Sequence, residues 1–587
     1  MQKETKPDFD FVVLKKVLRL AIPYKKLFLA CLLMVIVMAP IANIRPILIG
    51  KMVDDYILAK DISGLKMMAI IYLIFVFLNG VIRYLFTYYS AYLGQSVIKD
   101  LRVTVFNHVT SLKLRFFDQT PIGRMITRTI GDVQAINEIF TQGVLTMMAD
   151  ILGIIAILGF MFYHSWRLTL ICIITMPLMI FVTYIFKEKV KVAFFKVRNE
   201  ISSMNAFLQE QITGMQVVQI FNAEKQEADK FKKINRKYTQ ANLEAIEYYA
   251  IFYPVVELIS AFALALLVWW GSRGIWNNTI SPGAFVAFPL YLNMLFRPIR
   301  MLADKFNTLQ MGLVAADRVF KLLEDDAIIL DKGEIEKGSI YGKLTFDNVS
   351  FAYDEKNFVL KNISFDLAPG ETLAIVGSTG SGKTSIINIL NHFYEIQKGR
   401  ILVDDIDIRD YKMRTLRDRV AMVLQDVFLF NGTVIDNIRL RDDNISRDKI
   451  IEASKVIGAH PFIEKLPGSY DFKITERGSN LSMGQRQLIS FIRALVFDPN
   501  ILILDEATSS IDSETESIIQ YAIEKLIQKR TSIIIAHRLS TIKHADKIIV
   551  LDKGKIVEQG THEELLLVQS GHYAKLYEKQ FEQASVL

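Results

Sequence analysis

The stretch ETLAIVGSTGSGKTSIINIL, Glu371–Leu390, decides the fold of the C-terminal part of the chain. Its first segment, Thr372–Val376, is short and apolar, which predicts a buried strand. The segment Gly377–Thr384 follows at once, matches the pattern G-x-x-x-x-G-K-[ST], and runs into an apolar helical stretch. In this setting the glycines let backbone N–H groups wrap around phosphates, and the helix N-terminus adds its positive dipole. The stretch therefore predicts a P-loop in an α/β nucleotide-binding domain.

The P-loop supplies the first set of candidate site residues. Lys383 is expected to reach the β- and γ-phosphates of a nucleotide, and Thr384 is expected to hold Mg²⁺. The predicted phosphate cradle comprises Gly377, Ser378, Thr379, Gly380, Ser381, Gly382, Lys383, Thr384 and Ser385.

Three further segments place polar residues after apolar strands. In ILILDEATSS, the predicted strand Ile501–Leu504 is followed by Asp505, a candidate Mg²⁺ ligand, and Glu506, which is placed to polarise an attacking water. TSIIIAHRLS carries His537, a candidate for contacting the γ-phosphate, although a lone histidine at a strand end is more often structural. VLQDVFLFNGTV carries Gln425, which can reach Mg²⁺ or water.

The N-terminal part of the chain reads as a membrane domain. The chain has 587 residues, of which 51% are hydrophobic and 22% charged, so a membrane half joined to a soluble half fits both figures. A helix needs about 20 apolar residues to cross a bilayer. We therefore predict six transmembrane helices, the last being the shortest, at Leu27–Ile49, Met67–Tyr89, Val144–Tyr163, Leu168–Ile185, Ile251–Trp270 and Ala284–Leu295.

The charge distribution sets the predicted orientation. The segments 95–137 and 187–237 are rich in Lys and Arg, whereas the other connections are short. Positive loops stay in the cytoplasm, so both termini and the nucleotide-binding domain are expected there, in a multi-pass protein of the cytoplasmic membrane. The two long loops keep helical character and should extend the membrane helices. The net charge of +7 is thereby explained without nucleic acid.

The predicted domain boundaries follow the change in composition. Residues 1–325 form the transmembrane domain, 326–343 an acidic and glycine-punctuated linker, and 344–587 the nucleotide-binding domain. Phe11–Ile22 has apolar residues at helical spacing with basic residues between them, which predicts a helix at the membrane surface; an ordinary surface helix is the alternative. Cys31 and Cys172 lie in apolar runs and form no metal or redox pattern.

Four motifs follow the membrane spans in this order: the P-loop, LSMGQ, LILDEATSSID and IIAHR. This combination resembles the ATP-binding cassette (ABC) exporters. The resemblance covers nearly the whole chain and is closest to half-transporters of the multidrug or lipid-exporter type. It implies that Tyr353 stacks on adenine, that Gln425 couples nucleotide state to the membrane helices, and that His537 is a switch residue. It also implies Glu506 as the catalytic carboxylate and Lys383 as part of the catalytic set.

Other segments match the family as well. Ser509–Asp512 resembles the D-loop, and Thr475–Asn480, with Glu476, resembles the exporter segment that touches cytoplasmic loops. Phe116–Arg128 and Gly214–Glu227 resemble the two coupling-helix regions, the second of which usually docks on the partner's cassette.

The signature departs from the family pattern at one position. In LSMGQ, the resemblance implies that Ser482, Gly484 and Gln485 bind the γ-phosphate of a nucleotide held by a second cassette. The family has glycine where Met483 stands. Met483 either restricts the loop or points away without effect. Because each ATP site is composite, the chain needs a second half-transporter, and Met483 favours a different partner chain over a second copy.

The resemblance implies ATP-driven export of drugs or lipids by alternating access. The alternatives are a lipid flippase, a peptide exporter, and a nucleotide-gated or regulatory membrane subunit without pumping. A soluble cassette ATPase acting on DNA conflicts with the membrane spans. Polar residues within the spans are candidates for a substrate cavity, although each can also be structural: Asn43, Arg45, Arg83, Asp150, Glu257, Asn293 and Arg297.

Overall fold

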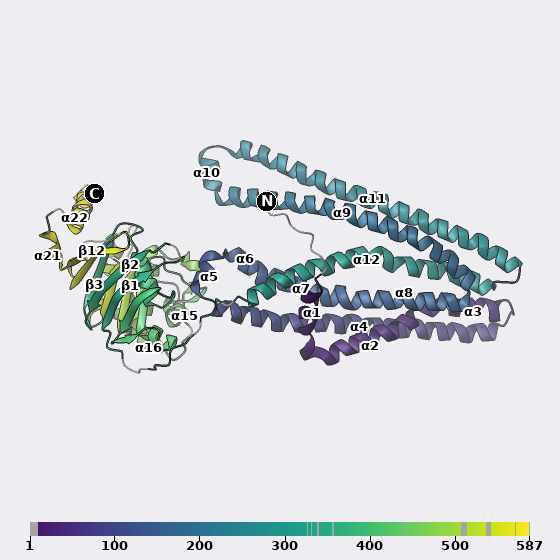
Figure 1. Cartoon of the computed structure of the whole chain (residues 1–587), viewed down its shortest axis with the longest axis horizontal. Coiled ribbons are helices and arrows are strands. Elements are labelled where there is room, and N and C mark those ends of the chain that lie inside the picture. Colours follow the sequence, from purple (N-terminus) through teal and green to yellow (C-terminus); the bar gives the residue numbers. More distant parts are fainter. Residues whose placement is uncertain are drawn as a thin grey trace. The chain divides into compact units, whose positions relative to one another are not determined.

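The computed structural model describes residues 10–325, 327–329, 331–336, 340–354, 357–440, 442–505, 513–535, 542–569 and 571–585, without the side chains of 300, 302–304, 307, 513–514 and 579–585. Backbone contacts divide the chain into two compact units (Figure 1). The membrane unit comprises Met1–Thr110 and Pro121–Asp326, and the cassette unit comprises Ser111–Thr120 and Ala327–Leu587. The cassette unit therefore takes in a short segment from the N-terminal part of the chain.

The described part of the membrane unit is helical throughout. Its α-helices are α1 (Phe11–Arg19), α2 (Lys25–Asn43), α3 (Arg45–Lys51), α4 (Ile62–Ser111), α6 (Ile122–Ile126), α7 (Val133–Glu138), α8 (Leu145–His164), α9 (Trp166–Thr213), α10 (Met215–Ile220), α11 (Glu224–Trp276) and α12 (Pro282–Leu323). Between them lie the 3₁₀-helix η1 (Ile22–Tyr24) and the π-helices η2 (Met52–Ile57), η3 (Thr127–Asp132) and η4 (Ile139–Val144).

Within the described residues, five helical stretches are long and apolar enough to cross a membrane. They are Ile22–Ile57, Ile62–Ser111, Ile122–His164, Trp166–Thr213 and Glu224–Trp276. Each contains one of the predicted runs. The sixth run, Ala284–Leu295, is helical within α12, which is not among the five, so a sixth span stays a prediction. The expected extension of the membrane helices is confirmed, because α9 and α11 have 48 and 53 residues, more than twice what a bilayer requires.

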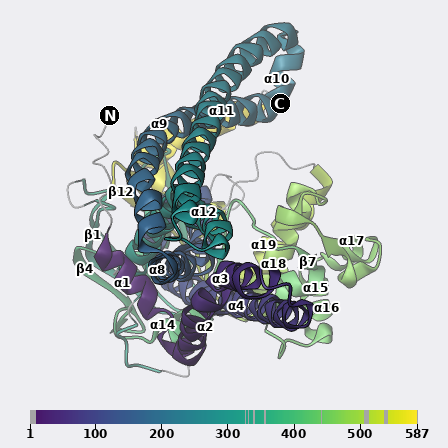
Figure 2. The ribbon, with the colours of Figure 1, turned by 90° about the vertical axis from the view of Figure 1, so that its right-hand side faces the viewer.

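The helices α9 and α11 form a long hairpin closed by α10, and Figures 1 and 2 both show the α10 end standing away from α8 and α12. Phe186 stacks on Phe252 with ring centroids 3.8 Å apart, and Lys196 pairs with Glu244 at 2.7 Å. At the tip, apolar side chains including Ile220 are exposed.

The helix α12 packs against α7, η4 and α8. Small residues permit the close approach: a Cβ on Gly312 would lie 2.4 Å from Cγ1 of Ile139. Two ion pairs flank this contact, Arg318 with Asp132 at 3.6 Å and Lys305 with Asp150. The charges in this region are thus paired between helices, as buried or membrane-depth charges generally are.

The cassette unit holds α5 (Leu114–Gln119) and a mixed α/β fold. Its strands are β1 (Leu344–Phe351), β2 (Leu360–Leu367), β3 (Thr372–Gly377), β4 (Lys398–Val403), β5 (Ile406–Asp407), β6 (Val420–Val423), β7 (Gly432–Thr433), β8 (Lys473–Ile474), β9 (Ile501–Asp505), β10 (Thr531–Ile535), β11 (Lys547–Asp552) and β12 (Lys555–Gly560). Its other helices are α13 (Lys383–Leu390), α14 (Met413–Arg419), α15 (Val434–Arg439), α16 (Arg447–Val456), α17 (His460–Glu464), η5 (Ser469–Asp471), η6 (Glu476–Gly478), α18 (Met483–Val496), α19 (Ser513–Ile527), α21 (His562–Leu566) and α22 (His572–Ser585).

A six-stranded sheet of order β12-β11-β3-β10-β9-β6 forms the centre of the cassette. The strands β11, β3, β10, β9 and β6 are parallel, and β12 closes one edge antiparallel to β11. A four-stranded antiparallel sheet, β2-β1-β4-β5, and a small pair, β7-β8, complete it. The parallel strands are buried on both faces, so they are runs of Ile, Leu and Val without alternation.

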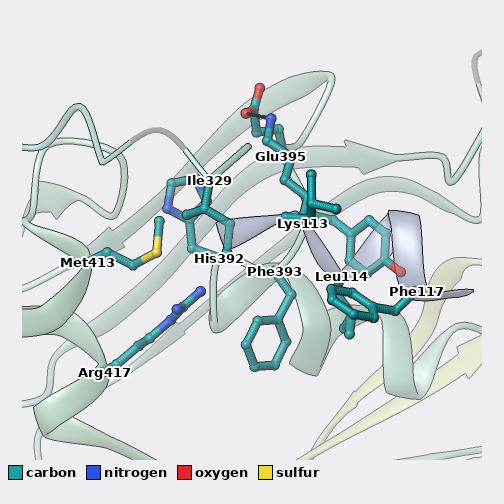
Figure 3. Close-up of a pocket in the computed structure, with 11 residues that line it drawn as sticks. Lys113, Leu114, Phe117, Ile329, His392, Phe393, Glu395, Met413 and Arg417 are labelled. Atoms are coloured by element: carbon teal, nitrogen blue, oxygen red, sulfur yellow. Dashed lines mark hydrogen bonds and ion pairs between the residues drawn. The ribbon is translucent and has the colours of Figure 1, made fainter. Parts of the chain in front are cut away.

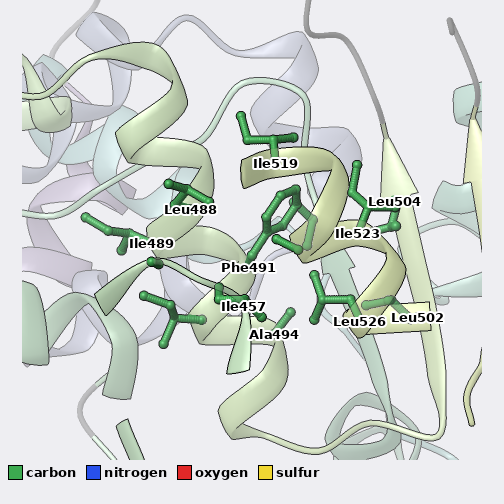
Figure 4. Close-up of a cluster of buried hydrophobic side chains, with 14 of the residues drawn as sticks. Ile457, Leu488, Ile489, Phe491, Ala494, Leu502, Leu504, Ile519, Ile523 and Leu526 are labelled. Atoms are coloured by element: carbon green, nitrogen blue, oxygen red, sulfur yellow. The ribbon is translucent and has the colours of Figure 1, made fainter. Parts of the chain in front are cut away.

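A hydrophobic core lies between the sheet and the helix pair α18 and α19 (Figure 4). Phe491 projects from α18 among Ile519 and Ile523 of α19, and its side chain is 1% exposed. Leu502 and Leu504 of β9 line the other side of this cluster. A large aromatic core residue thus ties the helix that carries the signature to the strand that ends in Asp505.

Candidate nucleotide site

The predicted P-loop lies between β3 and α13, the strand and helix that the sequence indicates. Gly382 is the N-cap of α13 and has φ = +109°, where a Cβ would lie 2.7 Å from Leu360 Cδ2, so a glycine is required. The hydroxyl of Ser381 is buried and has no hydrogen-bond partner among the described residues. An unpaired donor beside the uncapped N-terminus of α13 is suited to a phosphate oxygen.

The side chain of Lys383 lies along this loop. Its ammonium donates to the backbone carbonyls of Gly377, at 2.8 Å, and Ser378, at 3.0 Å. Burial lowers the pKa of Lys383, and the nearby Asp505 opposes this by raising it. The Lys383 ammonium is thus held at the mouth of the loop by two neutral carbonyl groups. The oxygen atoms of a phosphate can replace these acceptors at little cost in free energy.

Asp505 ends β9 at the same edge of the sheet. It pairs with Ile535 of the parallel strand β10, which in turn pairs with Ile375 of β3. The carboxyl ends of β9, β10 and β3 therefore meet where the P-loop begins, as in open α/β sheets that bind ligands. Glu506, His537 and the D-loop segment Ser509–Asp512 lie outside the described residues.

Tyr353 lies beside the P-loop helix. Its hydroxyl is 3.1 Å from Ser385 Oγ and accepts a hydrogen bond from the Asn388 amide at 3.1 Å. The side chain is 36% exposed, so it has surface available to a base, while the edge of the ring system packs against Phe351 and Tyr394. Asn388 and Tyr394 are not among the predicted site residues, because a lone Asn or Tyr on a helix or loop carries no local signal.

The signature segment begins α18. Ser482 is the N-cap: its hydroxyl accepts from the Gln485 backbone N–H at 3.2 Å, and the Gln485 side chain accepts from the Ser482 N–H at 3.0 Å. The Ser482 hydroxyl keeps its proton for a further acceptor. Gly484 is buried. Met483 is the first helical residue and is not among the residues with positive φ, so its backbone conformation does not require glycine.

The side chain of Met483 lines a cavity of about 300 Å³ together with Gln425. The other lining residues are Asp426, Val427, Arg477, Ser479, Arg486 and Gln487. Gln487 is 4% exposed, and its side-chain oxygen has no hydrogen-bond partner among the described residues. The structure thus brings Gln425, the signature helix and the Thr475–Asn480 segment to one cavity, and Tyr353, the P-loop and Asp505 to another region of the cassette.

The two predicted coupling segments fold as short helices. Phe116–Arg128 is divided at Thr120, which is extended, and Pro121, which caps α6. The part before this break belongs to the cassette unit. Gly214–Glu227 contains α10 at the tip of the α9–α11 hairpin.

The candidate cavity residues of the membrane unit are of two kinds. Asn43 is buried and donates to the carbonyls of Ala39 and Gly153, and Asp150 pairs with Lys305, so both have structural partners. Arg45 is half-buried and donates to the Ala42 carbonyl at 3.0 Å. The remaining candidates are exposed in the membrane unit: Arg83, Glu257, Asn293 and Arg297.

Two family models match the chain. The model of the ABC transporter transmembrane region matches residues 27–299, and the ABC transporter model matches residues 360–509. These ranges fall on the apolar helices and on the domain that carries the P-loop. The prediction of a helical membrane domain followed by an ABC ATPase domain is therefore confirmed.

Curated relatives align with almost the whole chain. It is 40% identical to an uncharacterised ABC transporter ATP-binding protein of Bacillus subtilis, YknV, over 98% of this chain and 96% of that one. It is 36% identical to the ATP-dependent lipid A-core flippase of Desulfotalea psychrophila, over 97% and 99%. It is 35% identical to a putative multidrug export ATP-binding/permease protein, YgaD, of Bacillus subtilis, over 95% and 98%.

A solved structure shares the fold. It is titled the structure of a bacterial Atm1-family ABC exporter with ATP bound, and it matches with a TM-score of 0.77 and 28% identity over 95% of this chain and 98% of that one. The family models, the relatives and this structure agree with the P-loop geometry described above. The chain belongs to the ABC transporter family and is an ATP-hydrolysing transporter of the exporter type.

Proposed function

We propose that the chain is one half of a dimeric exporter in the cytoplasmic membrane that moves lipids or hydrophobic drugs outward at the expense of ATP. The observation that carries the proposal is the P-loop, with Lys383 buried beside Asp505, in a chain whose described residues also include five apolar helical stretches long enough to span a membrane. The names of the flippase and multidrug relatives support the substrate class. The cassette is expected on the cytoplasmic side, where ATP is.

The residues present fit a magnesium nucleotide. Thr384 and Asp505 offer a hydroxyl and a carboxylate, the hard oxygen ligands that Mg²⁺ prefers. In this arrangement Lys383 binds the terminal phosphates, the N–H groups of the loop orient them, and Tyr353 packs against the base. Glu506 is proposed to take a proton from the attacking water, with His537 orienting the γ-phosphate.

The second half is required because the signature and the P-loop act on nucleotides held between two cassettes. Ser482 presents a free hydroxyl proton at the start of α18, which suits the γ-phosphate bound by a partner. Because the Met483 backbone is helical, only its side chain, at a position where the family has glycine, still favours a different partner chain. The oligomeric state and ATPase activity of this chain purified alone decide between a different chain and a second copy. A fully active homodimer would exclude the obligate heterodimer.

The test of export uses the purified protein in lipid vesicles. Fluorescent lipid and a lipophilic dye are followed across the bilayer with MgATP, for the unchanged chain with its partner half and for Glu506→Gln. The proposal expects movement of one probe that stops in Glu506→Gln while ATP still binds. Movement that persists without hydrolysis would instead identify a nucleotide-gated channel, and hydrolysis without any movement would favour a regulatory subunit.

A further inference from the structure

The N-terminal segment α1–η1 contacts two helices that lead from the membrane unit into the cassette unit. The helix α4 ends at Ser111, and just beyond it the Lys113 ammonium pairs with the Glu395 carboxylate of the cassette at 2.8 Å (Figure 3). The helix α12 ends at Leu323, shortly before the cassette unit resumes at Ala327. A segment that holds these ends of α4 and α12 therefore holds two of the connections between the units.

The contact with α12 is made by Lys16. Its ammonium pairs with the carboxylate of Glu324, the C-cap of α12, at 2.6 Å and lies 5.7 Å from the centroid of the Phe320 ring. Val13 and Val17 lie on the same face of α1 and are 6% and 0% exposed, and α1 packs against α12. An exposed ion pair alone contributes little to stability. Here it adds to a buried apolar contact, so α1 is fixed to the end of α12.

The contact with α4 is made by Tyr24, the last residue of η1. Its hydroxyl donates to the Asp100 carboxylate at 2.7 Å. A hydrogen bond to a charged acceptor is stronger than one between neutral groups. The segment α1–η1 thus bridges α4 and α12, two helices that are far apart in the sequence.

The opposite side of the segment is exposed and positively charged. Phe11, Lys15 and Arg19 follow one another at four-residue spacing, so they share one face of α1, and all three are exposed. Two more exposed cations, Lys25 and Lys26, follow at the start of α2. None of the four cations has an ion-pair partner among the residues that the structure describes. We refer to Lys15, Arg19, Lys25 and Lys26 as the basic face.

The order of residues along the chain places the basic face beside the bilayer. Lys25 and Lys26 directly precede the apolar run Leu27–Ile49. In this run Leu29 and Leu33 are 65% and 62% exposed, which gives α2 an apolar surface suited to lipid tails. Cations at the end of an apolar span lie at the level of the lipid headgroups. Because the apolar face of α1 is used against α12, α1 meets the membrane with its charged face.

We propose that the basic face is a binding site for the headgroups of anionic phospholipids, and that lipid bound there steadies the ends of α4 and α12. The negative charge of such a headgroup complements four cations that have no partner within the described chain. A bound headgroup restrains the segment α1–η1. The contacts of Lys16 with Glu324 and of Tyr24 with Asp100 pass this restraint to the two helices. The inference goes beyond the proposed function, because it concerns the lipids that surround the protein and not the compounds that it moves.

The test measures hydrogen exchange of the purified full chain in nanodiscs of phosphatidylcholine, with and without phosphatidylglycerol. The amides followed are those of α1, Val12–Arg19, and those of the last turn of α12, Phe320–Leu323. Phosphatidylglycerol is expected to slow exchange in α1 about fivefold or more, since one basic side chain near an anionic surface contributes about this factor. Exchange in the last turn of α12 should slow as well. Both effects should disappear in 1 M NaCl, where charges are screened beyond about 3 Å.

Variants separate the binding of lipid from its transmission to α12. Replacing all four residues of the basic face by Gln should abolish the lipid effect in both helices. The matched control removes three lysines and one arginine from exposed positions of α11 and should keep the effect: Lys232→Gln, Lys233→Gln, Arg236→Gln and Lys237→Gln. In Lys16→Gln, the lipid should still protect α1 but no longer α12. A merely structural role of Lys16 would instead change exchange equally in the two kinds of nanodisc.

Three results would overturn parts of the inference. Equal exchange with and without phosphatidylglycerol, or a full lipid effect after the basic face is replaced, would exclude the site. Should that fourfold variant fail to fold, a lipid effect in the unchanged protein that resists 1 M NaCl would exclude it equally. Lipid protection of α12 that persists in Lys16→Gln would exclude the transmission. The same protection by inorganic phosphate, added to nanodiscs of phosphatidylcholine alone, would identify a site for soluble anions and exclude the lipid.

Discussion

Replacing Gly382 by Ala is expected to weaken ATP binding without unfolding the cassette. Gly382 caps α13 with φ = +109°, a backbone conformation that L-residues rarely adopt. A Cβ would also lie 2.7 Å from the Leu360 side chain, closer than two non-bonded carbon atoms normally approach. Holding an L-residue in such a conformation costs about 1–3 kcal/mol. The contact adds to this only in part, because the end of the leucine side chain can move.

The strain becomes a loss of affinity because the free loop can relax. The alanine variant is expected to adopt a different loop conformation, and nucleotide binding must then restore the strained one. A cost of about 1–3 kcal/mol corresponds to about 5- to 150-fold weaker binding. The assay is equilibrium binding of AMP-PNP to the purified full chain, with circular dichroism as the check on folding.

The matched control for this prediction is Gly380→Ala. Gly380 also has positive φ, +82°, but a Cβ there meets nothing within 4 Å. It should therefore weaken binding less than Gly382→Ala does. Unchanged affinity in Gly382→Ala would refute the reasoning about strain, and equal losses in the two variants would refute the role of the contact with Leu360.

Three further changes have expected outcomes. Tyr353→Ala should weaken AMP-PNP binding by about 1–3 kcal/mol, the contribution of stacking a base on an aromatic ring, whereas Tyr353→Phe should stay close to the unchanged chain. Burial lowers the pKa of Lys383, whereas the charge of Asp505 raises it. Asp505→Asn should therefore lower this pKa further. Lys383 then loses its proton, and AMP-PNP binding measured in EDTA is lost, at a lower pH than in the unchanged chain. Phe491→Ala, at 1% exposure, should destabilise the cassette by about 3–5 kcal/mol in thermal unfolding; Phe497→Ala, at 39%, should cost less than about 1 kcal/mol.

Local sequence patterns predict much of the cassette because they set its local structure. The strand Thr372–Val376 is observed as β3, and the strand Ile501–Leu504 as β9. Each is a short run of apolar residues bounded by polar or glycine-rich segments, which is the pattern of a doubly covered parallel strand. The P-loop pattern likewise requires a strand before it and a helix after it.

Contacts between distant parts of the chain leave no such pattern. Asp118 and Tyr394 meet across 276 residues, and nothing in either neighbourhood indicates the other. Phe116–Arg128 is predicted as one region, whereas the structure breaks it between α5 and α6, where Thr120, the residue before Pro121, is extended. The conformation of Met483 was not predicted either, since glycine in a family pattern does not reveal whether the backbone needs it. The finding that Met483 is helical removes backbone strain as a reason for the heterodimer.

The membership of Ser111–Thr120 in the cassette unit bears on how these transporters can be recombined. A cassette cut out at the linker lacks α5, which contributes Leu114 and Phe117 to its surface, and the remaining membrane half would carry α5 without its binding site. The two halves are therefore not exchangeable modules. In a chimera between relatives, a transplanted cassette should bring its own version of this ten-residue segment with it, because Lys113 and Asp118 are fitted to Glu395 and Tyr394.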